Sequence, residues 1–192
     1  TCRRRERPFG RSRPALKFTK ILIIVRSGML KLRAFSENIF ATPPLDSLFI
    51  SAYDEKLTYA AFASRVSAAI DLLRPSFDRR QTLVFVVSEN TAAFVVALFA
   101  LNYLAQVVVP LFAGYAPAEL RALCDVYKPS LVISDKRFHP LFRALKARVL
   151  SFEDLSSTQP RVSPTVHHDQ EDICFILLTS GARGPAKGVV LT

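Results

Sequence analysis

The sequence predicts an α/β fold, in which a mostly parallel sheet is flanked by helices. Between residues 83 and 178, short β-branched runs alternate with segments of helical periodicity. The predicted strands are apolar at every position instead of every second one, which is typical of parallel strands covered on both faces. Half of the 192 residues are hydrophobic, including fifteen Phe, and a chain of this composition and length builds one globular domain or most of one.

The predicted elements begin at Leu57-Thr58-Tyr59, which opens an amphipathic helix that ends before Pro75. Pro117 suits the first turn of a later helix that ends at Tyr127. The segments 41–44 and 156–170 lack periodicity and are interpreted as a connector and a surface loop. The remaining elements alternate: strand 83–87, helix 91–104, strand 107–109, helix 117–127, strand 131–134, helix 138–147, strand 149–151 and strand 173–178.

The stretch from Asn90 to Ala118 carries no charged residue, and its length alone would permit a membrane span. Asn102 and Gln106 interrupt it, however, and the residues after Gln106 are β-branched. We therefore expect a buried helix followed by a buried strand, and no transmembrane segment.

The net charge of +10 is confined to one end of the chain. Residues 1–33 hold eleven Lys and Arg against one acidic residue, whereas residues 34–192 hold fifteen of each. We expect 1–33 to be a basic leader that is disordered or not native, since Met29 is the only methionine and a start there would leave 1–28 untranslated. Two alternatives stay open: a transit peptide, or a basic arm that binds nucleic acid or a membrane surface.

Three scattered cysteines without CxxC spacing argue against a disulfide framework and a zinc site, and they favour a reducing, cytoplasmic compartment. The run His167-His168-Asp169 is interpreted as solvated loop residues, because adjacent residues rarely converge on one metal ion.

The strand over 173–178 runs directly into a Gly-rich loop, Thr179 to Gly188. Glycines allow backbone N–H groups to turn toward an anion, hydroxyls donate to phosphate oxygens, and one lysine supplies a mobile positive charge. These properties predict a phosphate-binding loop for ATP, in which Arg183 either donates to a phosphate as well or blocks the loop. The candidate residues are Thr179, Ser180, Gly181, Arg183, Gly184, Lys187 and Gly188.

Two phosphate-loop patterns compete for this segment. The pattern GxxxxGK[ST] fails at Ala186 and Gly188, and it must open a helix, whereas Val189-Val190-Leu191 predicts a strand. The pattern [ST]SG[ST]TGxPKG of the adenylate-forming superfamily matches at Thr179, Ser180, Gly181, Gly184, Lys187 and Gly188. Leu57-Thr58-Tyr59 is similar to that family's LTYxEL segment, and residues 102–111 to its KAGAxxVPL segment, with Ala105 in place of glycine.

The chain thus resembles the N-terminal part of the large domain of an adenylate-forming enzyme, over about residues 45–192 and within a domain predicted at 34–192. The resemblance implies that Mg-ATP activates a carboxylic acid as an acyl-adenylate, which passes to a thiol, commonly coenzyme A. It implies further that the catalytic residues and the magnesium ligand lie beyond Thr192, so we expect this chain alone to be inactive and of low stability.

Ala182, Arg183 and Ala186 depart from the family pattern, and two hydroxyl donors are lost. An amino-acid adenylation domain and a degenerate, non-catalytic relative therefore remain as alternatives. A nucleic-acid or membrane-binding module is the rival from another class. The oligomeric state and the identity of the carboxylate have no signature in these residues.

Overall fold

A six-stranded sheet organises the part of the chain that the computed structural model describes, which is residues 22–23, 46–53, 55–156, 172–179 and 187–191. The strand order is β7-β6-β4-β5-β8-β9. Neighbouring strands are parallel except for β8 and β9, which pair antiparallel. The bounds are β4 (Leu83–Ser88), β5 (Val107–Phe112), β6 (Leu131–Ser134), β7 (Val149–Ser151), β8 (Phe175–Thr179) and β9 (Lys187–Leu191).

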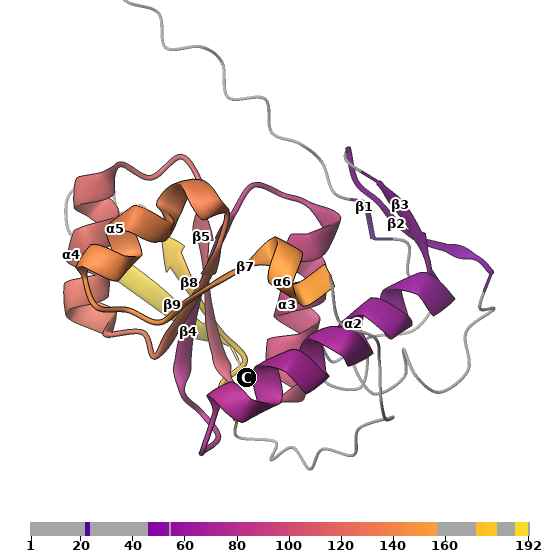
Figure 1. Ribbon diagram of the computed structural model, residues 1–192, viewed down its shortest axis with the longest axis horizontal. Coiled ribbons are helices and arrows are strands. Elements are labelled where there is room, and N and C mark those ends of the chain that lie inside the picture. Colours follow the sequence, from indigo (N-terminus) through magenta and orange to yellow (C-terminus); the bar gives the residue numbers. More distant parts are fainter. Residues whose placement is uncertain (1–21, 24–45, 54, 157–171, 180–186, 192) are drawn as a thin grey trace, which may run out of the picture.

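Helices cover both faces of this sheet (Figure 1). One face carries α2 (Tyr59–Leu73), α3 (Ala92–Tyr103) and α6 (Phe152–Ser156), and the other carries α4 (Pro117–Tyr127) and α5 (His139–Ala144). The helix after β4 and the helix after β5 therefore lie on opposite faces. In open α/β sheets such a reversal creates a crevice at the carboxyl ends of the strands, where ligands bind. The predicted fold class is confirmed.

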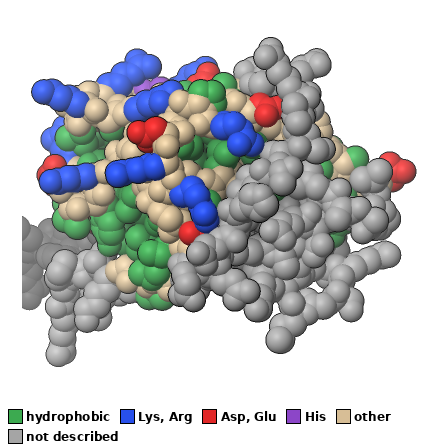
Figure 2. Space-filling model, turned by 90° about the horizontal axis from the view of Figure 1, so that it is seen from below, with side chains coloured by type: hydrophobic (Ala, Val, Ile, Leu, Met, Phe, Trp, Pro, Cys, Tyr) green, Lys and Arg blue, Asp and Glu red, His purple; other side chains and the backbone are tan. Residues whose placement is uncertain are grey.

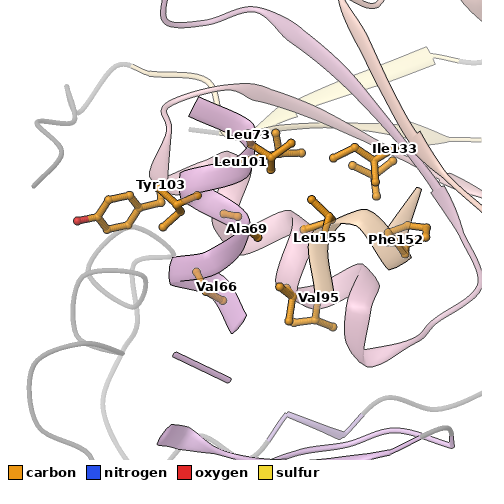
Figure 3. Close-up of a cluster of buried hydrophobic side chains, with 14 of the residues drawn as sticks. Val66, Ala69, Leu73, Val95, Leu101, Tyr103, Ile133, Phe152 and Leu155 are labelled. Carbon is orange, nitrogen blue, oxygen red and sulfur yellow. The ribbon is translucent and has the colours of Figure 1, made fainter. Parts of the chain in front are cut away.

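Successive residues of β4 enter two separate cores, which explains why its sequence is apolar throughout. Val84 and Val86 join the core beneath α2, α3 and α6, whereas Phe85 and Val87 join the core beneath α4 and α5. Figure 3 shows the first core, where side chains of α2 such as Val66 and Leu73 meet side chains from α3, β6 and α6. Each fully buried side chain of this kind stabilises the fold by roughly 1.5–3 kcal/mol.

Threonine caps set the starts of α2 and α3. The Thr58 Oγ1 accepts a hydrogen bond from the Ala61 N–H at 3.2 Å, and the Thr91 Oγ1 accepts one from the Phe94 N–H at 3.1 Å. Each bond satisfies a backbone donor that the first helical turn leaves without a partner. The Leu57-Thr58-Tyr59 segment is thus a strand end joined to a helix cap, as its position at the start of the predicted helix requires.

A small second sheet was not predicted. Its antiparallel strands are β1 (Leu22–Ile23), β2 (Leu48–Ser51) and β3 (Lys56–Thr58). Phe49 and Ile50 of β2 are buried in the first core, so this sheet packs onto the α2 side of the domain. Two residues of the basic leader therefore form a strand, whereas the other leader residues and the connector 41–44 lie outside the described residues.

Several predicted bounds change. The helix predicted over 138–147 divides into a 3₁₀ turn, η2 (Lys136–Phe138), and the shorter α5, which ends before Lys146 because that residue has a left-handed φ of 58°. The segment after β7 forms α6 before the predicted loop begins. Helix α2 ends at Leu73, before Pro75 as predicted, and a second 3₁₀ turn, η1 (Arg74–Ser76), follows it.

The uncharged stretch at 90–118 forms the buried helix α3 and the strand β5, as predicted. The strand continues past the predicted residue 109 to Phe112, with Pro110 opposite Val86. Within the described ranges, no helix is both long enough and apolar enough to cross a membrane.

Candidate phosphate-loop site

The candidate site lies at the turn between β8 and β9. Thr179 of β8 is the register partner of Lys187 of β9, and Leu178 is the partner of Gly188. Because β8 runs parallel to β5, Thr179 lies at the carboxyl edge of the sheet. The hairpin thus places a hydroxyl residue and a lysine side by side at the edge where α/β sheets bind ligands.

Three of the predicted site residues, Thr179, Lys187 and Gly188, are in described strands. The others, Ser180, Gly181, Arg183 and Gly184, lie outside the described residues, and so do Ala182 and Ala186. The segment after the loop is a strand, as the adenylate-forming pattern predicts, and not the helix that GxxxxGK[ST] requires.

Gly188 has a packing reason for being glycine. A Cβ atom built on it would lie 2.7 Å from Cγ2 of Ile176 and 3.1 Å from the hydroxyl oxygen of Tyr127. Ile176 and Tyr127 belong to the core beneath α4 and α5, so a side chain here would push β9 away from β8 and α4. The absence of a side chain at Gly188 therefore allows β9 to pack closely against β8 and α4 where the loop ends.

A buried polar side chain at the opposite, amino edge of the sheet links the starts of β4 and β5. Gln106 is 2% exposed, and its Oε1 accepts hydrogen bonds from the N–H (3.0 Å) and the hydroxyl of Thr82. Its Nε2 donates to the carbonyls of Leu104 (2.8 Å) and Arg79 (3.2 Å). The hydrogen-bonding capacity of this buried amide is therefore filled.

The sequence pattern did not predict this amide network. In the sequence, Gln106 is visible only as an interruption of an apolar run. One local signal was present: Ala105 stands where the related segment has glycine, and the structure gives Ala105 a left-handed φ of 53°.

A group of charged side chains surrounds the carboxyl ends of β4, β6 and β7. The Arg137 guanidinium lies 3.1 Å from a Glu89 carboxylate oxygen and 3.5 Å from one of Asp135. Partial burial raises the pKa of Asp135, and the nearby Arg137 opposes this shift. These side chains are substantially exposed, so each pair contributes little to stability. Figure 2 shows basic side chains gathered on one face of the molecule, with acidic side chains between them.

The described residues hold no group of three or more His, Cys, Asp or Glu that could bind a metal ion, and His167-His168-Asp169 falls outside them.

The chain matches the family of AMP-binding enzymes over residues 36–192 and belongs to it. Among curated proteins it is similar to the nonribosomal peptide synthetase otaB of Aspergillus carbonarius, with 26% identity over 159 residues, covering 82% of this chain and 8% of the synthetase.

Two solved structures share the fold. ATP-bound MatB from Rhodopseudomonas palustris superposes with a TM-score of 0.70 and 19% identity, covering 82% of this chain and 34% of MatB. The fatty acyl-CoA synthetase of Mycobacterium tuberculosis superposes with a TM-score of 0.61 and 23% identity, covering 72% and 29% of the two chains. The chain thus spans about a third or less of the length of these proteins.

Proposed function

We propose that this chain supplies the phosphate loop of an enzyme that uses ATP to activate a carboxylic acid as an acyl-adenylate, and that a thiol then accepts the acyl group. The single observation that carries the proposal is the hairpin that pairs Thr179 with Lys187 at the carboxyl edge of a parallel sheet, in a chain of the AMP-binding family.

In this proposal the residues of the hairpin bind and orient the triphosphate. Lys187 neutralises charge on the β- and γ-phosphates, and Thr179 and Ser180 donate hydroxyl hydrogen bonds. The α-phosphorus stays open to the carboxylate, which displaces pyrophosphate. Catalysis on this side of the active site then consists of positioning and charge neutralisation. ATP arrives with Mg²⁺, which supplies further neutralisation of the phosphates.

We further propose that adenylation requires the parts of the fold that lie outside this chain in MatB and the acyl-CoA synthetase. In both structures, the part of the chain that has no counterpart here is about twice as long as the matched part. The acid-binding pocket, the magnesium ligand and the acceptor site are assigned to those parts.

Coenzyme A is the acceptor that we propose, and the described fold's likeness to a fatty acyl-CoA synthetase supports it. The likeness to a nonribosomal peptide synthetase supports a second candidate, an amino-acid adenylation domain. The two candidates differ in the acid that reacts with ATP to release pyrophosphate, and in the thiol that accepts the acyl group.

Binding of ATP to the 192-residue chain is the first experiment, measured by calorimetry with Lys187→Ala and with Lys56→Ala as the control. Lys56 is an exposed lysine of β3, in the other sheet. Loss of one charge-assisted phosphate contact weakens binding by roughly ten- to a hundredfold. Equal affinity of the Lys187→Ala variant and the unaltered chain would contradict the role of this lysine.

The acid and the acceptor are tested in a protein that contains the whole adenylate-forming domain. ATP–pyrophosphate exchange is measured with a panel of amino acids and with a panel of aliphatic acids, followed by mass spectrometry for a coenzyme A thioester. Exchange with amino acids alone would favour the second candidate. Absence of exchange with every acid, despite binding of ATP, would favour a degenerate relative.

A further inference from the structure

Two residues with left-handed backbones meet at the amino edge of the sheet, between β4 and β5. Gln81 has a φ of 58° and Ala105 a φ of 53°, and the Gln81 N–H donates to the Ala105 carbonyl at 2.9 Å. A non-glycine residue rarely adopts this conformation and retains it only where other contacts outweigh its cost. The side-chain contacts of Gln81 therefore have to outweigh the cost of its left-handed backbone.

The Gln81 side chain binds the entry of β8 as a neighbouring strand would. Its Oε1 accepts from the Ile173 N–H at 2.9 Å, while its Nε2 lies 3.3 Å from the Ile173 carbonyl and 3.0 Å from the Ala105 carbonyl, as a donor to both. One amide thus satisfies both backbone groups of a residue 92 positions later in the chain.

An ion pair reinforces the same junction. Arg80, next to Gln81, pairs through its guanidinium with the carboxylate of Asp172, next to Ile173. The Asp172 side chain is 11% exposed, the lowest exposure of any carboxylate in the ion pairs of the described residues, whereas Arg80 is about half exposed.

On the β5 side the backbone alone ties the start of β8 only loosely, whereas on the other side β8 pairs with β9 along five residues. Within the described residues, Val108 and Phe175 are the single register pair between β5 and β8, supported by the Val108 N–H bound to the Cys174 carbonyl at 3.0 Å. A one-residue slip of a strand turns each of its side chains to the other face of the sheet. A slip of β8 against β5 would therefore displace Thr179, and with it the paired Lys187, relative to the rest of the sheet.

We propose that Gln81 is a positioning residue, whose side-chain amide fixes the register of β8 and thereby places the two ends of the phosphate loop, Thr179 and Lys187. The effect on nucleotide binding rests on the proposed function, whereas the effect on β8 does not.

The experiment compares the full chain with Gln81→Gly and Gln81→Asn. Both replacements tolerate a left-handed φ, and neither can reach Ile173, so they remove the amide contacts without adding backbone strain. Ser130→Ala is the matched control, because the Ser130 hydroxyl also donates to a backbone carbonyl at the amino edge of β4, that of Leu83 at 3.0 Å, on the side away from β8. Amide hydrogen exchange is followed at 173–178, and binding of ATP is measured in parallel.

We expect the Ile173 amide and the amides of β8 to exchange roughly tenfold faster in both Gln81 variants, as the loss of ordinary hydrogen bonds requires. The amides of β4 and β6 keep their rates, the Ser130→Ala control leaves β8 unchanged, and the affinity for ATP falls several-fold. Unchanged exchange at 173–178 overturns the proposal. Faster exchange with unchanged affinity for ATP overturns the link to the loop.

The two proposals fail separately. If the unaltered chain binds no ATP, the proposed function fails for this chain, and the exchange rates alone decide whether Gln81 anchors β8. If both Gln81 variants unfold, the milder variant Asp172→Asn, which removes the carboxylate charge that pairs with Arg80, takes their place. Selective acceleration of exchange at 173–178 in that variant supports the junction, and uniform acceleration across all strands overturns it.

Discussion

Replacing Gln106 by Met is expected to destabilise the domain strongly, although the two side chains are similar in size and shape. Gln106 is 2% exposed, so no solvent can replace its hydrogen bonds. The Thr82 N–H and the Leu104 carbonyl, bonded to it at 3.0 and 2.8 Å, would lose these buried partners. Each of these two groups costs about 1–3 kcal/mol, and the added apolar burial offsets about 1 kcal/mol, so the net loss is about 1–5 kcal/mol.

Urea denaturation of the full chain measures this loss as a lower midpoint with an unchanged m-value. Thr82→Val is the comparison, because it removes only the hydroxyl that donates to Gln106 and leaves the backbone N–H bonded. We expect it to cost less than Gln106→Met, and we expect the double variant to cost less than the sum of the two. A loss below about 0.5 kcal/mol for Gln106→Met would refute the reasoning, since it would mean that the network contributes no more than a surface contact.

Three further predictions concern the site and the two faces of the sheet. Gly188→Ala is expected to lower the free energy of unfolding by about 1–3 kcal/mol through overpacking. The double variant with Ile176→Ala is expected to lose less stability than the sum of the two single changes. Denaturation midpoints of the single and double variants measure both effects. Burial, and secondarily the adjacent Asp125, raises the pKa of the Cys124 thiol to about 11, so at pH 8 it should react with iodoacetamide far more slowly than Cys in the urea-unfolded chain; equal rates would contradict this. Hydrogen bonds from the Ser151 N–H and hydroxyl lower the pKa of Asp154 in the folded state, so Asp154→Ala should destabilise the domain at neutral pH, by less than about 1 kcal/mol because the carboxylate is exposed and solvent screens it. The stabilisation from a lowered folded-state pKa is fully present above the ordinary value of the group and is lost as the pH falls from there through the lowered value. The cost of Asp154→Ala should therefore shrink over that range, and a cost independent of pH would exclude the carboxylate as its source.

Local patterns were sufficient for most of the large sheet. The continuously apolar runs of β4 and β6 and the caps at Thr58 and Thr91 depend on a few neighbouring residues, and the strands and helices that they predict are present. The shortened α5 was not predicted, because its end depends on the left-handed φ of Lys146, a residue type without special preference for that conformation.

For the candidate loop, too, the sequence predicts some features, and others depend on distant residues. Its composition, the strand before it and the strand after it are visible in the sequence, and they distinguish it from a loop that opens a helix. The reason for glycine at position 188 was not visible, because Tyr127 approaches it from α4, sixty-one positions earlier along the chain.

From the order of its residues alone, this protein could be recognised as an α/β chain with an adenylate-forming type of loop, because periodicity, capping and loop composition are local properties. Strand order, the antiparallel β9 and the Gln81 contact with Ile173, 92 positions away, became apparent only in the folded chain. Such contacts depend on how the strands are arranged once both faces of the sheet are buried, and the local pattern is compatible with more than one arrangement. The candidate phosphate loop is therefore visible in the sequence, whereas the amide that we propose to hold its strand in place is visible only in the structure.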